Sequence, residues 1–223
     1  IILNSTIPEE ELAKEKNVVA EEIRLYEDSP DDKVHDLVIR ALLPSSAIGL
    51  PVLGTLATVS GVTRDQIQSY RRTHFVGPNM VVAAAGYLDA DDFIPRVEEY
   101  FAPLAAGLAA APPPVLNWPP VVPAVEKDTE QTHICVGIPG LPFDHPDRYA
   151  FAVLSTVLGG NTSSRLFRKV REERGLAYAV YAYNRAFFDA GALVAYAGTN
   201  PGAATQTRDL ILQELAALAQ NPV

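Results

Sequence analysis

The sequence predicts an α+β fold, with layers of mostly antiparallel β-sheet covered by helices, in two folded units joined by a proline-rich linker. One observation is that strand-like and helix-like apolar patterns fall into separate runs, which favours α+β layers over a doubly wound sheet. Another is that 7 of the 18 prolines lie at positions 103–123, while positions 100–125 carry no charge. Prolines at this density exclude a membrane-spanning helix, so an extended stretch is expected. The predicted organisation is a folded unit at residues 1–103, a linker at 104–124 and a second unit at 125–223.

The first unit is predicted to contain four helices and one strand. Ser29 is a favoured N-cap, and Pro30 suits the first turn of a helix. Thr63 and Gln66 have the spacing of a capping box, which predicts another helix start. These signals and the apolar periodicity place helices at residues 8–27, from residue 30 onwards, at 63–74 and at 90–101, and a strand at 80–85.

The second unit is predicted to begin with a strand and to contain a two-stranded hairpin between helices. Gly159 with Gly160, and later Gly175, are expected to end helices, because glycine is the common residue after a helix C-terminus. The expected elements are strands at residues 133–138, 177–183 and 190–198, and helices at 146–158, 163–174 and 203–219.

Composition excludes several classes of function. A net charge of −9 and a pI near 4.9 argue against a nucleic-acid-binding protein, which needs a basic face. Cys135 is the single cysteine, so an internal disulfide framework and a cysteine-based zinc finger are excluded. Neither end resembles a natural terminus or a signal peptide, and we expect both to be cuts within a longer chain.

The opening helix carries two acids near its apolar face. Glu15 and Glu22 are seven residues apart, close to two helical turns, and lie at the edge of that face, whereas Glu21 points the opposite way. Carboxylates on an apolar face are costly unless a metal ion, an arginine or a histidine pairs with them. The alternative, which the spacing alone favours, is that both reach water at the margin. The apolar face itself comprises Leu12, Val19, Ile23 and Tyr26.

At these residues the sequence resembles the pitrilysin/insulinase family of zinc metallopeptidases, most closely the mitochondrial-processing-peptidase branch and its bacterial relatives. The resemblance covers most of the chain outside the linker, in the family's order. It rests on residues 15–23 (EKNVVAEEI), 26–30 (YEDSP), 49–55 (GLPVLGT), 79–86 (NMVVAAAG), 158–160 (LGG), 163–167 (SSRLF) and 171–178 (REERGLAY).

The resemblance implies two half-domains of the pitrilysin-type fold and part of a zinc site. In these inverzincins, His-x-x-Glu-His supplies two zinc-binding histidines and a general base, and a downstream glutamate is the third ligand. Glu22 matches that ligand, and Glu15 matches an acid that supports the site. His-x-x-Glu-His does not occur in these 223 residues. The four histidines, which we expect to be ordinary surface or core residues, are His35, His74, His133 and His145.

The second unit carries a further candidate pair. Taken alone, Arg171 near a helix end and Tyr178 on the next strand are common structural features that do not indicate a function. The resemblance implies that this pair reaches the zinc site, holds the substrate and stabilises the tetrahedral oxyanion.

The sequence therefore predicts the middle segment of a zinc metalloendopeptidase that hydrolyses unfolded or presequence-like peptides. The alternative is a non-catalytic partner or scaffold subunit of the same family, which binds peptides or assembles a complex. Expected partners are Zn²⁺, a peptide or unfolded protein, and a second subunit in a homo- or heterodimer. Neither nucleic acid nor a membrane span is expected, and the bacterial cytoplasm and periplasm remain open as compartments.

Overall fold

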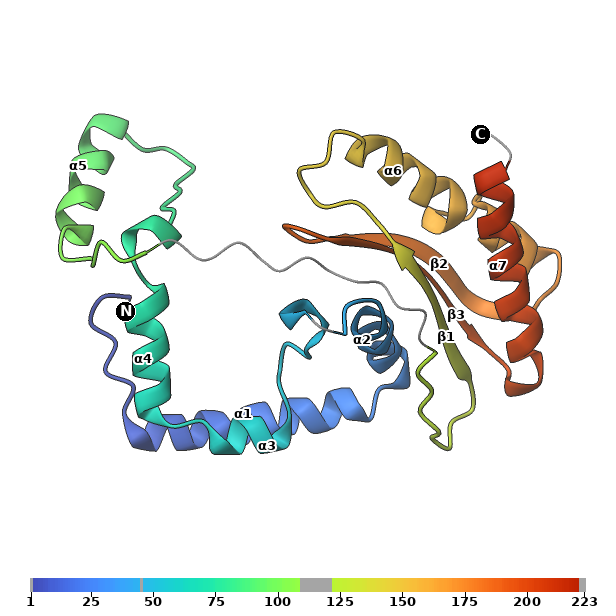
Figure 1. The fold of residues 1–223 in the computed structure, drawn as a ribbon, viewed down its shortest axis with the longest axis horizontal. Coiled ribbons are helices and arrows are strands. Elements are labelled where there is room, and N and C mark those ends of the chain that lie inside the picture. The colour runs from blue at the N-terminus through green and yellow to red at the C-terminus, as the bar shows by residue number, and fades with distance from the viewer. Residues whose placement is uncertain (1, 45, 109–121, 221–223) are drawn as a thin grey trace. The chain divides into compact units, whose positions relative to one another are not determined.

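The computed structural model describes residues 2–44, 46–108 and 122–220, and the chain divides into two compact units. The first unit consists of Ile1–Ile23 and Leu53–Pro113, and the second of Arg24–Val52 and Pro114–Val223. Helix α1 (Glu9–Glu27) therefore begins in the first unit and ends in the second. Figure 1 gives the element labels used below.

This division differs from the boundary predicted at residue 103. Residues 24–52 pack with the second unit, because the apolar face of helix α2 (Pro30–Leu42) is buried against the sheet of that unit. Most of the predicted linker, residues 109–121, lies outside the described residues. The assignment of residues 1–103, 104–124 and 125–223 to two half-domains and a linker thus stays a prediction.

Helices dominate the first unit. After α1, it contains α3 (Leu56–Gly61), α4 (Arg64–His74) and α5 (Ala90–Phe101). The Thr63 hydroxyl oxygen accepts a hydrogen bond from the backbone N–H of Gln66, and the side-chain oxygen of Gln66 accepts one from the backbone N–H of Thr63. This reciprocal pair confirms the predicted capping box. A second capping box, formed by Thr55 and Thr58, starts α3, which was not predicted.

Side chains of α4 hold the segment that leads into α1. Arg71 donates from Nη1 to the carbonyl oxygen of Ser5 at 2.7 Å, and Arg64 donates from Nε to that of Ile7 at 2.8 Å. Lys16 on α1 donates to the carbonyl of Ser60 at the end of α3, at 3.0 Å. These charge-assisted hydrogen bonds fix the start of α1 on its neighbours.

The strand predicted at residues 80–85 is wrong for this chain. The segment follows a 3₁₀ turn at Gly77–Asn79 and has extended backbone at Met80, but it pairs with no strand in the described residues. Val81 is 93% exposed. A strand requires a neighbouring backbone to accept and donate its hydrogen bonds, and the described part of the first unit offers none.

A three-stranded antiparallel sheet organises the second unit. Its strands are β1 (Thr132–Pro139), β2 (Ala177–Ala186) and β3 (Gly191–Thr199), in the order β1-β3-β2. All three predicted strands are confirmed, and β2 continues beyond its predicted end. Every residue of the central strand β3 is buried, because helices cover both faces of the sheet.

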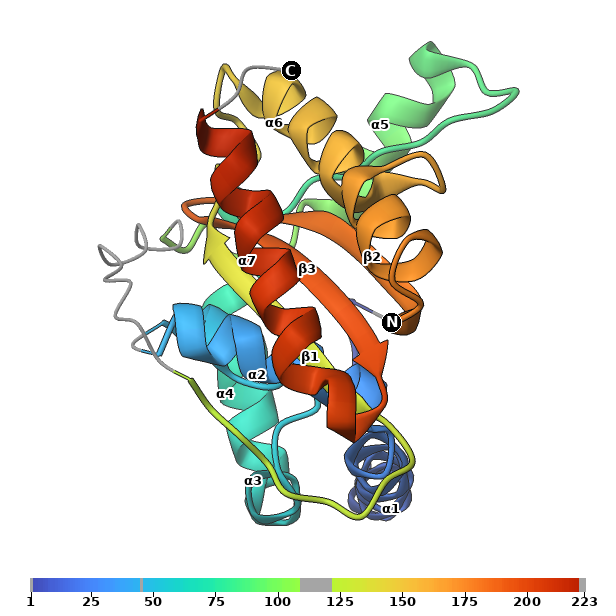
Figure 2. The same cartoon turned by 90° about the vertical axis from the view of Figure 1, so that its right-hand side faces the viewer.

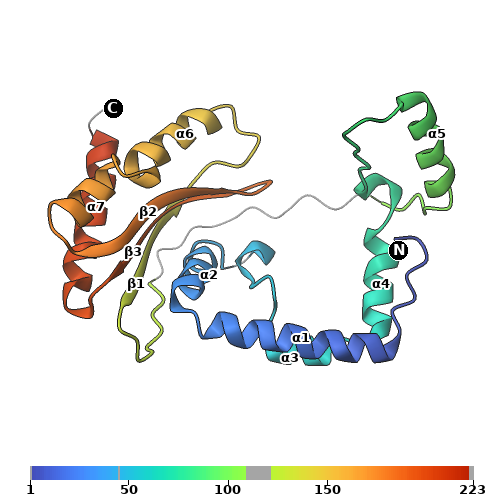
Figure 3. The same cartoon turned by 180° about the vertical axis from the view of Figure 1, so that it is seen from behind.

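Successive residues of β3 point to opposite faces of the sheet. Leu193, Ala195 and Ala197 pack against the helical layer that contains α6 (Arg148–Ser155) and α7 (Ala204–Gln220). Ala192 and Val194 face α2 instead. Figure 2 shows α7 lying along β3 and β1, and Figure 3 shows α2 on the other side of the sheet from α6 and α7.

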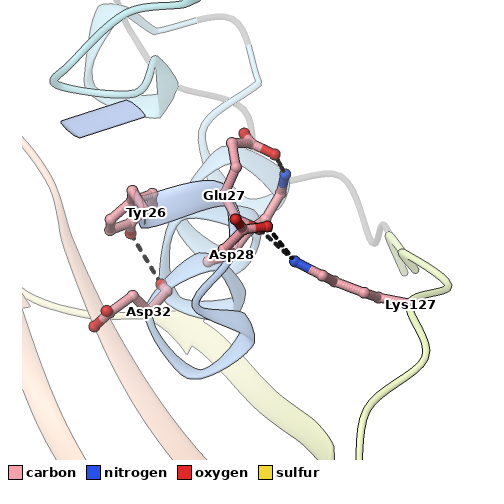
Figure 4. Close-up of polar contacts among 6 residues, drawn as sticks. Tyr26, Glu27, Asp28, Asp32 and Lys127 are labelled. Atoms are coloured by element: carbon pink, nitrogen blue, oxygen red, sulfur yellow. Dashed lines mark hydrogen bonds and ion pairs between the residues drawn. The ribbon is translucent and has the colours of Figure 1, made fainter. Parts of the chain in front are cut away.

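Polar contacts at the α1–α2 junction join the end of α1 to the segment before β1 and to α2 (Figure 4). Lys127 donates from Nζ to the Glu27 carbonyl and to Asp28 Oδ1, both at 3.0 Å. Tyr26 donates to the Asp32 carbonyl at 2.9 Å. Burial and the nearby Asp36 raise the pKa of Tyr26 to about 12, so the phenol keeps its proton for this bond.

Candidate functional site

The structure brings the predicted pair Arg171 and Tyr178 into direct contact. The guanidinium carbon Cζ of Arg171 lies over the Tyr178 ring, 4.4 Å from its centroid. Arg171 belongs to a π-helical segment, Phe167–Glu172, and Tyr178 is the second residue of β2. Short π-helical segments are frequent at functional sites. The contact is a cation–π interaction between side chains from consecutive elements.

A left-handed glycine makes the turn between the two residues. Gly175 has φ +60°, and its N–H donates to the Arg171 carbonyl at 3.1 Å. The next amide, Leu176, donates to the Val170 carbonyl at 2.9 Å. A Cβ on Gly175 would meet no atom within 4 Å. Glycine is therefore favoured here by backbone conformation, as in an αL helix cap, and not by lack of space.

A β-bulge then sets the direction of Tyr178. Ala177 pairs with Thr199 and Ala179 pairs with Gly198, which leaves Tyr178 as the extra residue between two paired positions. Ala177 and Val180 both belong to the core, whereas Tyr178 is 76% exposed. A bulge turns the affected side chain away from the regular alternation, and bulges are common beside active sites.

Thr199 anchors the backbone beside this bulge. Its side chain is 1% exposed, and its hydroxyl donates to the Leu176 carbonyl at 2.5 Å. Thr207 on α7 lies 3.2 Å away, between hydroxyl oxygens. This role of Thr199 was not predicted, because nothing in the local sequence pattern shows which carbonyl a strand threonine will meet.

The Arg171 guanidinium also lies over a second ring. Its Cζ is 4.8 Å from the centroid of Phe167, one helical turn earlier. Within residues 2–44, 46–108 and 122–220, no carboxylate forms an ion pair with Arg171. The N–H groups of the guanidinium are thus open to an oxygen acceptor from a bound molecule.

Glu15 and Glu22 both lie on α1 with exposed side chains. The predicted apolar face of the helix is confirmed, since its four members are buried or half-buried. Among the described residues, no three His, Cys, Asp or Glu side chains are grouped closely enough to hold a metal ion. The described residues therefore do not make a zinc site by themselves, and Glu22 fits such a site only as one ligand of several.

His35 lies in a polar and aromatic cluster that was not predicted from the sequence. Its Nδ1 is 2.7 Å from the Tyr183 hydroxyl and its Nε2 is 3.0 Å from the Tyr181 hydroxyl. Cys135 Sγ is 3.4 Å from the same Nδ1. The alternation of Tyr181 and Tyr183 along β2 is the signal that places both phenols on one face, toward α2.

Burial dominates the proton equilibria of this cluster. It lowers the pKa of His35, an effect that the nearby Asp32 opposes, and it raises the pKa of the Cys135 thiol to about 12. It also raises the pKa of Tyr183 above the ordinary tyrosine value. The lowered pKa favours neutral His35 near pH 7, and the raised pKa favours the protonated thiol of Cys135 over the nucleophilic thiolate.

Comparisons with known proteins show which family this chain resembles. Residues 61–223 match the family model described as the peptidase M16 inactive domain. The uncharacterized zinc protease YmxG of Bacillus subtilis is 39% identical over all of this chain and 54% of its own length. A similarly named zinc protease of Mycobacterium leprae, ML0855, is 38% identical over 98% of this chain and 50% of its own length. The chain thus spans about half the length of the curated relatives that it matches.

Solved structures show the same fold. The peptidase M16 inactive domain from Pseudomonas fluorescens superposes with a TM-score of 0.92 at 23% identity, over 99% of this chain and 54% of that one. A protease from Helicobacter pylori gives a TM-score of 0.82 at 23% identity, over 98% of this chain and 55% of that one. In the described ranges, no helix combines the length and apolar character that a membrane crossing needs.

Proposed function

The chain belongs to the peptidase M16 family, and from this premise we propose that it is a segment of a zinc-dependent metalloendopeptidase acting on unfolded or presequence-like peptides. The observation that carries the proposal is the contact of Arg171 with Tyr178 at 4.4 Å, with the guanidinium N–H groups free of any ion pair among the described residues. The names of the relatives as zinc proteases support the reaction class.

Arg171 and Tyr178 have the donors that peptide hydrolysis needs. A guanidinium and a phenol both donate hydrogen bonds to carbonyl oxygens, and both strengthen those bonds as negative charge develops on oxygen. The αL turn at Gly175 and the bulge at Tyr178 hold the two side chains together before substrate arrives. Donors that are positioned in advance need little rearrangement in the transition state.

We assign Glu22 as one zinc ligand and Glu15 as a residue that supports the site. The remaining ligands and the general base come from outside the described residues. A zinc ion bound in such an enzyme acts as a Lewis acid toward the scissile peptide group.

The first experiment compares Glu22→Gln with Glu21→Gln in the full-length protein that carries this chain. The expected result is that Glu22→Gln lowers both the zinc content, measured by mass spectrometry of the metal, and the hydrolysis of a quenched fluorescent peptide. Glu21→Gln, a matched change one residue away on α1, should leave both near wild type. Unchanged zinc content and activity in Glu22→Gln, with folding intact, would reject the assignment.

A second candidate function is a non-catalytic subunit that binds peptides or assembles a complex. The match of residues 61–223 to a model described as an inactive domain favours it. Such a subunit should bind an unfolded peptide without cleaving it and should activate a catalytic partner. The full-length coding sequence separates the two functions, because an intact His-x-x-Glu-His rejects the second and degenerate residues at that motif reject the first.

A further inference from the structure

The Phe167 ring lies beside Arg171 and has no role in the function proposed above. We propose that Phe167 is a positioning residue: its ring holds the Arg171 guanidinium next to Tyr178, with the N–H groups directed to a substrate carbonyl. This inference rests on the proposed function, because it concerns how Arg171 is made ready for a peptide. Cζ of Arg171 lies over both rings, at 4.8 Å from the Phe167 centroid and 4.4 Å from that of Tyr178.

The two rings differ in how firmly they are held. Phe167 is half-buried and packs against the core cluster that includes Leu166 and Val170. Tyr178 is 76% exposed and does not belong to that core cluster. A ring held by core packing restricts a neighbouring side chain more than an exposed ring does. Phe167 is therefore the fixed support, and Tyr178 the partner that can also meet the substrate.

The backbone places Phe167 for this contact. Phe167 and Arg171 lie four residues apart in the π-helical segment, close to one helical turn, so their side chains lie on the same face. Arg168 and Arg174, on the same stretch of chain, are exposed, and no aromatic ring lies under either within the described residues. In the described part of the chain, Arg171 is the arginine whose Cζ lies over two rings.

The contact leaves the chemistry of Arg171 available. A cation–π interaction uses the face of the ring and does not occupy an N–H donor with an acceptor, as a carboxylate would. An arginine side chain has several rotatable bonds, so an unsupported guanidinium spends much of its time in other orientations. A ring contact restrains it while keeping its fork of donors free for a carbonyl oxygen.

The test is a double-mutant cycle in the full-length protein, with kcat/KM for an unfolded peptide as the readout. Phe167→Leu keeps an apolar side chain for the core but removes the π face, and we expect kcat/KM to fall about three- to tenfold. Phe167→Tyr, which restores a ring, should recover most of that loss. In an Arg171→Ala background, Phe167→Leu should have no further effect, because the group that it positions is gone. If Phe167→Leu lowers the melting temperature, Phe167→Met replaces it in the cycle as the variant that lacks a ring.

A second readout does not depend on activity. In protein labelled with [¹⁵N]arginine, the Nε–H resonance of Arg171 is identified by its loss in Arg171→Lys. Phe167→Leu should speed the exchange of this proton with water, and Phe167→Tyr should not.

The outcomes separate this inference from the proposed function. An equal loss of kcat/KM from Phe167→Leu in both backgrounds, or an unchanged Nε–H exchange rate, would mean that Phe167 only packs, and the proposed function would stand. Wild-type activity in Arg171→Ala would reject the role of Arg171 together with this inference.

Discussion

Replacing Gly175 by alanine tests the left-handed backbone turn that shapes the candidate site. Gly175 has φ +60°, and a Cβ added there would have no atom within 4 Å, so a methyl group adds strain without a clash. An L-residue with a Cβ in the left-handed region costs about 1–2 kcal/mol. We expect Gly175→Ala to lower the free energy of unfolding by that amount and Gly175→Asn to lower it less, because asparagine tolerates this conformation.

Gly202 provides the matched control in the same unit. Its backbone is not left-handed, and the nearest atom to an added Cβ is Asn200 Oδ1 at 3.5 Å, an ordinary contact. Gly202→Ala should change the free energy of unfolding by less than about 0.5 kcal/mol. Urea unfolding followed by far-UV circular dichroism measures both variants. With a slope of about 2–3 kcal/mol/M, Gly175→Ala should lower the midpoint by roughly 0.5 M. Equal midpoints for the two variants, at unchanged slope, would refute the strain argument.

Three further predictions concern the second unit. Gly159→Ala places a Cβ 2.3 Å from the backbone nitrogen of Ala182, so it should lower the free energy of unfolding in urea by about 3 kcal/mol or more. Gly160→Ala is the control: the nearest atom to its Cβ is in the Thr156 side chain, at 3.3 Å, and the free energy of unfolding should fall clearly less. Burial lowers the pKa of His35, so as the pH falls the unfolded chain binds a proton before the folded chain does. The free energy of unfolding should therefore be constant above about pH 6.5 and decrease below it, until the pH reaches the pKa of the folded state. A His35→Gln variant that keeps the same dependence would exclude His35 as its cause. Cys135, whose thiol pKa is raised to about 12, should resist iodoacetamide near pH 8 in the native protein and react once urea unfolds it, as intact mass will show; rapid native labelling would contradict this.

Local signals in the sequence predicted most of the elements. The Thr63–Gln66 capping box and the Pro30 start of α2 depend on neighbouring residues alone, and both are present. At the start of α2, however, the Ser29 hydroxyl donates to Asp31 Oδ1 at 2.7 Å and makes no capping hydrogen bond to the helix backbone. The position of the cap was predictable, whereas the partner of its hydroxyl was not.

Features that depend on pairing between distant segments could not be predicted. Residues 80–85 have the composition of a strand, but strand formation requires a partner backbone that local composition does not reveal. The bulge at Tyr178 arises from the register of β2 against β3, and the π-helical hydrogen bonding of Phe167–Glu172 leaves no signal in the local sequence. The resemblance of residues 171–178 to a known family pointed to the pair, and only the structure shows how Gly175 and the bulge bring the two side chains together.

The most direct test of the account compares Arg171→Ala with Arg174→Ala in the full-length protein. Both variants remove a guanidinium from the same turn, but Arg171 contacts Tyr178 and Arg174 is exposed. We expect Arg171→Ala to lower kcat/KM for an unfolded peptide by about 100-fold or more, as the loss of a hydrogen-bond donor to the oxyanion does, and Arg174→Ala to stay near wild type. Equal activities in the two variants, with both proteins folded, would contradict the central claim.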